Sequence, residues 1–289
     1  MPLPNVLIIG AMKAGTTSLY MDIVDRNGAC LAQDKEPHAL CDDAVLTAAG
    51  RAAYEANYAH AAVGDVCCDA STGYAKRPDV EGVVARANAL LPADYKVIYM
   101  VRHPIDRIVS QHHHEHTEGL VGPDVNEEVR RHDRYVQYSR YAYQLEPWME
   151  QLGADRIRIV RFEDYVSRRR ETVRELHGFI GLTVEKEAQT EGRVYNKSQG
   201  KPVKSRRWEY IRQSRIYRQW LRRLAHPKLR LALQRLILPK AAEELAPPSE
   251  RTLSFLRDEL RDDVSSLERL LGRSMEWSGF ESTSQTPVA

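Results

Sequence analysis

The sequence predicts an α/β fold that contains a P-loop, with a mostly parallel central sheet flanked by helices and a helical C-terminal part. Short apolar runs typical of buried strands alternate with helical stretches as far as Gly181, and the first run leads into a glycine-containing loop. Strands that alternate with helices form parallel sheets covered on both faces. Ligands of such sheets bind at the carboxyl ends of the strands, where this first loop would lie.

The predicted strands are four apolar runs. They span Val6–Ile9, Ala62–Cys68, Lys96–Val101 and Ile157–Phe162. The helical stretches between them cover residues 17–24, about 79–91, 104 onwards, 141–152 and 167–180. Pro104 suits a first helical turn, because the N–H that proline lacks would have no partner there.

The C-terminal part departs from this alternation. Pro247-Pro248-Ser249 precedes a last predicted helix, whose apolar stripe indicates packing against the core. The stripe consists of Leu253, Leu256, Leu260, Val264, Leu267 and Leu271. We expect a single domain over residues 1–289, with a β/α core at about 1–182, a loop and helical part at about 183–281 and a frayed tail at 282–289.

Composition indicates a cytoplasmic globular protein. The first five residues lack the charged start of a signal peptide, and the 289-residue chain contains no apolar run long enough to span a membrane. The four cysteines are Cys30, Cys41, Cys67 and Cys68. Their spacing suits neither zinc binding nor a disulfide framework, so we expect buried free thiols in a reducing compartment.

Positive charge is concentrated in one segment, although the net charge is only +2. Between Lys201 and Lys240 the only acidic residue is Glu209. Such a segment fits nucleic acid, an anionic lipid, an anionic ligand or a solvated helix face. Within it, residues 216–224 form a basic amphipathic stretch that suits either an anionic membrane surface or packing against the sheet.

The segment Gly10-Ala11-Met12-Lys13-Ala14-Gly15-Thr16-Thr17-Ser18 follows the first strand and opens a helix. This arrangement directs backbone N–H groups and the positive end of a helix dipole at one anion. A Walker A loop carries its lysine directly after the second glycine. Here Thr16 has that position and Lys13 precedes Gly15, so the loop is suited to a phosphate without requiring a magnesium-bound nucleoside triphosphate.

A second signal begins at Arg102, which ends a predicted strand, while Ser110 lies on the following helix. A guanidinium and a hydroxyl suit a phosphate dianion; the alternative is that Arg102 pairs with a carboxylate at the strand end. A third signal is Lys35-Glu36-Pro37-His38, in which an acid and an imidazole occupy an irregular loop. They are candidates for proton transfer, and the alternative is a solvated surface glutamate.

These motifs resemble the sulfotransferases that use 3′-phosphoadenosine 5′-phosphosulfate (PAPS), in the branch that contains heparan sulfate sulfotransferases and many bacterial soluble enzymes. The resemblance covers nearly the whole chain. Further segments similar to landmarks of that family, in the same order, are Gly64–Tyr74, Tyr138–Tyr141, Arg161–Asp164, Phe179–Leu182 and Asn196–Pro202. The resemblance implies transfer of a sulfuryl group to a hydroxyl or amine, with adenosine 3′,5′-bisphosphate (PAP) as the second product and no metal.

The resemblance also implies roles for individual residues. The loop residues Lys13, Ala14, Gly15, Thr16, Thr17 and Ser18 would bind the 5′-phosphosulfate. Arg102 and Ser110, with Gly200 and Lys201 of a loop that closes over the nucleotide, would bind the 3′-phosphate. Lys13 would also stabilise the leaving phosphate, Glu36 would act as catalytic base and His38 would orient the acceptor or Glu36. His38 and then Asp69 are the next candidates for the base.

The sequence departs from the family pattern on the acceptor side. Ala39-Leu40 stand where Phe-Phe is frequent, Thr72 stands where proline is usual, and Ala70 replaces a lysine common in the heparan branch. A glycosaminoglycan acceptor is therefore not indicated. We expect a small-molecule, lipid or glycan acceptor and no nucleic acid; peripheral membrane contact, the oligomeric state and the identity of the acceptor stay open.

Two other functions remain as alternatives. A P-loop kinase or nucleotide hydrolase would need an acidic magnesium ligand at a strand end, for which Asp69 is a weak candidate, and a non-enzymatic polyanion-binding protein would use the basic segment. The run His112-His113-His114-Glu115-His116 invites a metal interpretation, but we expect these histidines to line the acceptor cleft or face water. Several aromatic residues fit either the acceptor cleft or the core: Tyr135, Tyr138, Tyr141, Tyr143 and Trp148.

Overall fold

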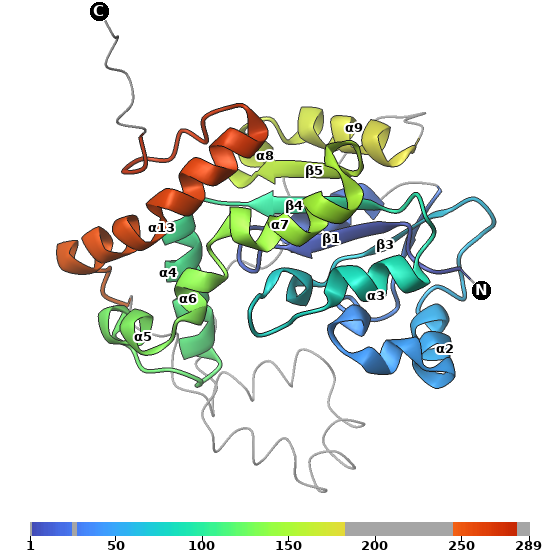
Figure 1. The fold of residues 1–289 in the computed structure, drawn as a ribbon, viewed down its shortest axis with the longest axis horizontal. Coiled ribbons are helices and arrows are strands. Elements are labelled where there is room, and N and C mark those ends of the chain that lie inside the picture. Colours follow the sequence, from blue (N-terminus) through green and yellow to red (C-terminus); the bar gives the residue numbers. More distant parts are fainter. Residues whose placement is uncertain (1, 25–27, 183–244, 282–289) are drawn as a thin grey trace, which may run out of the picture.

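The computed structural model describes residues 2–24, 28–182 and 245–281 (Figure 1). Its centre is a parallel sheet with the strand order β2-β3-β1-β4-β5. The strands are β1 (Val6–Gly10), β2 (Ala29–Leu31), β3 (Val66–Asp69), β4 (Lys96–Val101) and β5 (Ile157–Arg161). Every residue of β1 is buried, and so is every residue of β4 after Lys96, as expected for central strands covered on both faces. The predicted parallel sheet is confirmed.

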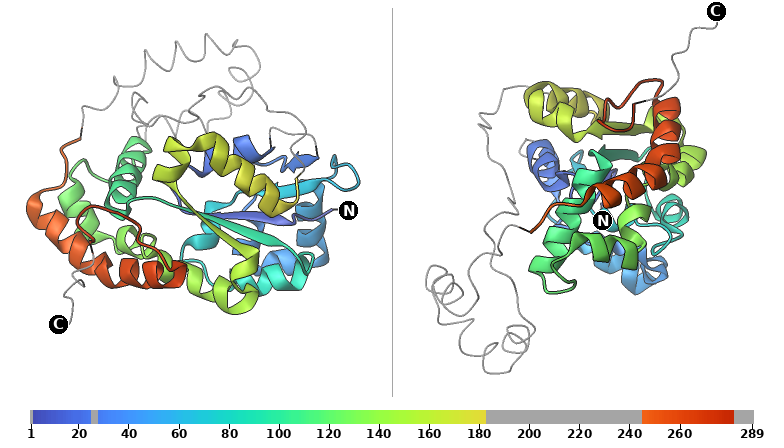
Figure 2. Two further views of the ribbon diagram at one scale, coloured as in Figure 1. Left: turned by 90° about the horizontal axis from the view of Figure 1, so that it is seen from above. Right: turned by 90° about the vertical axis from the view of Figure 1, so that its left-hand side faces the viewer.

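The described helices are α1 (Thr16–Val24), α2 (Ala48–Ala56), α3 (Val83–Leu90), α4 (Pro104–Thr117), α5 (Val125–Arg131), α6 (Arg134–Gln137), α7 (Tyr141–Leu152), α8 (Phe162–Ser167), α9 (Arg169–Ile180) and α13 (Glu250–Leu271). Short 3₁₀ helices cover Ala39–Cys41 (η1), Asp43–Leu46 (η2), Thr72–Ala75 (η3) and Ala154–Arg156 (η4). Helices α1 and α9 lie on one face of the sheet, and α3 and α7 lie on the other (Figures 1 and 2). Helices α4, α6 and α13 gather beyond the carboxyl ends of the strands (Figure 1).

Helices α1 and α9, which cover the same face of the sheet, are joined by a buried ion pair. Asp22 of α1 accepts hydrogen bonds from Arg169 at 2.7 and 2.8 Å and from the Tyr165 hydroxyl at 2.6 Å. The two bonds from Arg169 and the one from Tyr165 replace the hydrogen bonds to water that the Asp22 carboxylate loses on burial. The contact fixes the helix that follows the first loop.

Helix α13 packs its apolar stripe as the sequence predicts. Leu256, Leu260, Val264 and Leu267 are fully buried, with α7 as the main neighbour. The Asp263 carboxylate accepts hydrogen bonds from the N–H groups of Ala142 and Tyr143, at 3.0 and 2.9 Å. A carboxylate at these first N–H groups satisfies donors that have no partner within α7.

Two element starts and one strand differ most from the sequence prediction. The strand predicted to start at Ala62 begins only at Val66, because Asp65 folds back to accept a hydrogen bond from the Ala62 N–H at 2.8 Å. Helix α3 begins at Val83 and not at residue 79, because tertiary contacts hold the preceding segment: the Arg77 N–H and guanidinium bind Gln144 and the Tyr143 carbonyl, both at 2.8 Å. Strand β2 was not predicted, because three residues carry no readable period and only pairing with β3 makes them a strand.

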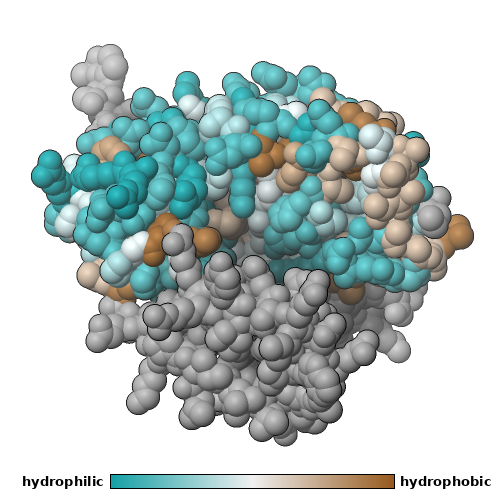
Figure 3. Space-filling model, turned by 90° about the horizontal axis from the view of Figure 1, so that it is seen from below, coloured by the Kyte–Doolittle hydropathy of each residue, from teal (hydrophilic) through white to brown (hydrophobic). Residues whose placement is uncertain are grey.

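Several sequence predictions lie outside the described residues. They concern Gly200 and Lys201, the closing loop at 196–202, the basic segment between Lys201 and Lys240 with its amphipathic stretch, and the tail at 282–289. Among the described helices, none is both long enough and apolar enough to cross a membrane. On the face shown in Figure 3 the described surface is mostly hydrophilic, and hydrophobic side chains occur in small groups.

Candidate active site

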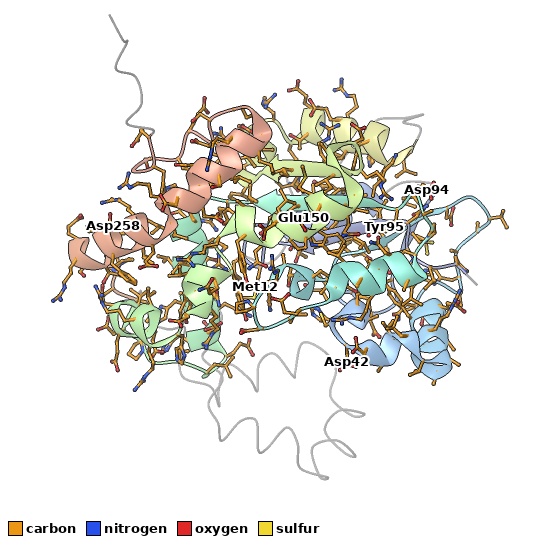
Figure 4. The ribbon with its side chains drawn as sticks, viewed as in Figure 1. Met12, Asp42, Asp94, Tyr95, Glu150 and Asp258 are labelled. Atoms are coloured by element: carbon orange, nitrogen blue, oxygen red, sulfur yellow. The ribbon has the colours of Figure 1, made fainter. Side chains whose placement is uncertain are left out.

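The loop after β1 lies at the carboxyl edge of the sheet. Met12, within this loop, lies close to α6, whereas Asp94 and Tyr95, which precede β4, lie at the opposite end of the sheet (Figure 4). The Ala11 N–H donates to the Met100 carbonyl at 2.6 Å, which ties the loop to β4. Gly15 has a φ of 94°, and a Cβ there would lie 2.9 Å from the Phe162 ring. The turn therefore requires glycine, and it directs the first N–H groups of α1 toward the loop's concave side.

Lys13 has a left-handed backbone, with a φ of 70°. Its carbonyl accepts a hydrogen bond from the Arg102 guanidinium at 3.5 Å, so the first and second sequence signals meet at this edge. Burial lowers the pKa of His113, and the charge of Lys13 lowers it further. The sequence analysis did not single out His113 as a neighbour of Lys13. Its position three residues after Ser110, on the same side of α4, was the available signal.

Arg102 leaves β4 with its guanidinium 5.0 Å from the centre of the Phe162 ring. Its carbonyl accepts a hydrogen bond from the Tyr141 hydroxyl at 2.7 Å, which fixes the backbone at the strand end. The carboxylate partner considered as an alternative exists only as a 3.9 Å contact with exposed Asp106, a separation at which an ion pair contributes little. Ser110 is half-buried on α4, and no described residue hydrogen-bonds its hydroxyl.

Glu36 lies at the centre of a polar cluster. Its Oε2 accepts a hydrogen bond from the Thr72 hydroxyl at 3.2 Å and lies 3.4 Å from Nε2 of His38. Its Oε1 lies 3.4 Å from Nζ of Lys35, which also donates to the Thr17 hydroxyl at 2.7 Å. Lys35 therefore links Glu36 to the first turn of α1, and the third sequence signal joins the phosphate loop.

The two ionisable groups of this cluster shift each other's pKa. Burial opposes ionisation of Glu36, but its bonds with His38 and Thr72 and the charge of Lys35 outweigh burial and lower its pKa to about 2. Hydrogen bonds with Cys41 and Glu36 raise the pKa of His38 to about 9, against the effect of burial. At neutral pH the pair is a carboxylate beside an imidazolium.

His38 is held by a buried network that begins at Asp69. The His38 N–H donates to the Ser71 hydroxyl at 2.9 Å, and Ser71 donates to Asp69 at 2.6 Å. Asp69 also accepts hydrogen bonds from the hydroxyls of Tyr54 and Tyr74, both at 2.7 Å, and it is 0% exposed. The carboxylate is enclosed and occupied, so its candidacy as a magnesium ligand or as the catalytic base was wrong.

Arg107 is a fully buried cation beneath the first loop. Its guanidinium donates to the Ser139 hydroxyl at 2.8 Å and to the carbonyls of Tyr135 and Met12 at 2.9 and 3.4 Å. None of these acceptors carries a charge, and burial lowers the pKa of Arg107. The sequence analysis missed this residue, because only the folded chain shows that it supports the loop at Met12.

Residues 84–221 match the family model of the sulfotransferase domain. The structure of a sulfotransferase from Alicyclobacillus acidocaldarius is similar over 95% of this chain and 98% of its own, with a TM-score of 0.64 and 19% identity. The chain therefore has the fold of that sulfotransferase, and residues 84–221 match the sulfotransferase domain. The sulfotransferase domain of a curacin biosynthetic pathway is similar over 67% of this chain and 81% of its own, with a TM-score of 0.46 and 17% identity. No curated protein matches the sequence.

The histidine run does not have the place that the sequence analysis gave it. His112 is 1% exposed, and its Nε2 lies 3.0 Å from the Gly122 carbonyl. Nδ1 of His116 lies 3.1 Å from the Val121 carbonyl, and the two rings stack. For His112 the prediction of a cleft or solvent position was wrong, because both rings fasten the turn after α4. No group of three or more potential metal ligands occurs among the described residues.

The five aromatic residues that the sequence analysis placed in either the acceptor cleft or the core have different surroundings in the structure. Tyr135, Tyr141 and Trp148 are fully buried and pack in the core. Tyr143 stacks against the Arg77 guanidinium at 4.2 Å. Of these five aromatic side chains, only Tyr138 has a lysine ammonium over its ring, that of Lys76. The four cysteines are free, and Cys41 alone of them is not buried.

Proposed function

We propose that the protein transfers the sulfuryl group of PAPS to a hydroxyl or amine of a small-molecule, lipid or carbohydrate acceptor, by in-line displacement with Glu36 as base. The observation that carries this proposal is the arrangement of Lys13, Arg102 and Glu36 at one edge of the sheet. The loop that contains Lys13 suits a 5′-phosphosulfate, and Arg102 with Ser110 suits a separate 3′-phosphate. Glu36 is joined to the loop through Lys35 and Thr17.

In the proposed reaction the acceptor oxygen or nitrogen attacks sulfur and the bond from sulfur to the bridging phosphate oxygen breaks. The electron pair of that bond stays on the departing 5′-phosphate of PAP. The ammonium of Lys13 and the first N–H groups of α1 would stabilise the negative charge that grows on this oxygen. The acceptor proton passes to Glu36. No metal clamp enters the proposal, because the cations of the site come from side chains.

Glu36 can accept a proton only if the acceptor displaces part of its present hydrogen bonding. In the described structure Thr72 and His38 share one carboxylate oxygen and Lys35 approaches the other. An acceptor hydroxyl that takes the place of Thr72 or His38 would remove a bond that keeps the pKa of Glu36 low, so basicity would rise when the substrate is present. His38 would then orient the acceptor.

The pH profile separates Glu36 from His38 as base. Because the pKa of Glu36 is lowered to about 2, the carboxylate stays ionised and kcat/KM should be flat between about pH 5 and 8. Because the pKa of His38 is raised to about 9, a neutral imidazole base would give a rate that rises about tenfold per pH unit up to pH 9. Initial rates with saturating PAPS would distinguish the two, and the rising profile would contradict Glu36.

Gly73→Ala tests the position of His38 without changing any ionisable group. An added Cβ would lie 2.7 Å from Nδ1 of His38 and 2.8 Å from Sγ of Cys41, so the imidazole and the thiol must shift from their present positions. We expect kcat to fall about tenfold or more, with a melting temperature close to that of the wild type. Unchanged kcat would show that the position of the His38 ring does not matter for turnover.

Differential nucleotide binding tests the proposed donor. PAP should raise the melting temperature of the full chain, whereas ATP with magnesium and AMP should not, because neither carries a 3′-phosphate. Arg102→Met should abolish the PAP shift and leave the unliganded melting temperature unchanged. Equal shifts with ATP would support a kinase or hydrolase in place of the sulfotransferase, and no shift with any nucleotide would contradict the proposal.

A further inference from the structure

Lys76 is a cation beside the candidate active site to which neither the sequence signals nor the proposed mechanism gives a role. It follows η3, the short helix that carries Thr72, the hydroxyl partner of Glu36. Its ammonium lies 5.7 Å from the centre of the Tyr138 ring. The charges of Glu36 and Glu115 favour its ionised form, and the charge of Arg107 opposes it. Lys76 therefore lies near the residue proposed as base.

Among the described residues, no carboxylate lies within ion-pair distance of Lys76 and no group accepts a hydrogen bond from it. The Tyr138 hydroxyl, at the far end of the ring, donates to Asp79. The remaining contact is the ring face, which attracts a cation weakly. Burial lowers the pKa of the Lys76 ammonium, as expected for a charge that has lost water without gaining an acid.

The nearby acids have other partners. Glu36 contacts Lys35, His38 and Thr72. Glu115 accepts hydrogen bonds from the Arg134 guanidinium, the Gln111 amide and the Tyr135 hydroxyl, at 2.8, 2.8 and 2.7 Å. The deeper cation, Arg107, contacts only neutral acceptors. Neither carboxylate therefore neutralises the charge of Lys76.

We propose that Lys76 recognises a negatively charged group on the acceptor, so that the preferred acceptors are hydroxyl or amine compounds that also carry a carboxylate, sulfate or phosphate. This inference rests on the proposed function and names its substrate class. The donor phosphates are assigned to the loop after β1 and to Arg102 with Ser110. Lys76 follows η3, whose Thr72 bonds Glu36, and the acceptor must reach Glu36 for Glu36 to take its proton.

The position of Lys76 also accounts for a departure from the family pattern. Ala70 is 3% exposed, so a lysine at that position would have to leave the core in this chain. Lys76 instead follows the C-terminal end of η3, and its ammonium lies over the ring of Tyr138, directly after α6. In this chain the charge therefore comes from a different residue.

The test compares acceptors that differ only in charge. The full-length protein is assayed with labelled PAPS on 4-hydroxyphenylacetate and its amide as phenols, and on 3-hydroxyoctanoate and its amide as aliphatic alcohols. The variants are Lys76→Met, which keeps an unbranched stem over Tyr138, and Lys76→Arg, which keeps the charge. The PAP-induced shift in melting temperature is measured for each protein, because it reports the donor site independently of the acceptor.

For at least one pair, the wild type should favour the acid over the amide by about tenfold or more in kcat/KM, the usual size of a hydrogen-bonded charge contact. The preference should vanish in Lys76→Met and persist in Lys76→Arg, mainly through KM. Equal use of acid and amide, a preference that survives Lys76→Met, or no turnover of any acid by a wild type that binds PAP would overturn the inference. A wild type that PAP does not stabilise would overturn the proposed function and the inference together.

Discussion

Lys13→Ala should lower kcat about 10²- to 10³-fold, the size measured when one preorganised stabiliser of developing charge is removed. Lys13 lies in the loop after β1 with a left-handed backbone, and its carbonyl accepts a hydrogen bond from Arg102. The charge that it would stabilise is larger in the transition state than in the bound donor. The loss should therefore appear mainly in kcat, with little change in KM for PAPS.

Lys13→Arg is the matched comparison for this effect. It keeps the positive charge but replaces a compact ammonium by a longer planar group, which would not reach the same oxygen with the same geometry. We expect it to recover only part of the lost rate. Steady-state rates and the PAP-induced thermal shift of the three proteins provide the measurement, and a Lys13→Ala protein with near-normal kcat and intact PAP binding would show that another group stabilises the leaving oxygen.

Glu36→Gln should lower kcat by about 10²- to 10⁴-fold, the range typical of losing a positioned general base. Glutamine has nearly the same shape and can still accept a hydrogen bond from Thr72, so the loop should keep its position. It cannot take a proton, and it removes the negative charge between Lys35 and His38. The pKa of His38 should fall toward its ordinary value, because one of the interactions that raises it is lost.

Two controls make this result specific. Glu171→Gln makes the same change on an exposed turn of α9, away from the cluster, and should leave kcat unchanged. Thr72→Val removes the hydroxyl that bonds Glu36 but leaves the carboxylate, and should reduce kcat far less than Glu36→Gln. Near-normal kcat in Glu36→Gln, with PAP binding intact, would transfer the role of base to His38.

The sequence was most informative where the chemistry is local. The loop from Gly10 to Ser18 is contiguous, so its glycines, its lysine and the start of α1 could be read without a structure. The apolar runs that became β1 and β4 were equally clear, because a central parallel strand is buried on both faces and shows few polar residues. Strand β2 escaped notice, because its pairing with β3 depends on residues far away in the chain.

The candidate site itself was only partly readable. The sequence indicated Glu36 and Arg102 as separate signals, but nothing in it showed that Lys35 reaches Thr17 or that Thr72 donates to Glu36. Asp69 was misjudged for the same reason: an acid at a strand end suits a metal or a proton, and only the three surrounding hydroxyl donors reveal a structural role. Interactions between distant segments leave no periodic trace in a single sequence.

The amino-acid order alone determined the alternation of strands and helices, the anion-binding loop and the presence of an acid and an imidazole in one short segment, because each depends on neighbours in the chain. The folded chain decided which charges are neutralised. It enclosed Asp69 and Arg107, joined Lys35 to the loop helix and left Lys76 over an aromatic ring without an acid. The cause is physical: the free energy of a charge depends on its partners and its access to water, and both are set by segments that meet only in three dimensions.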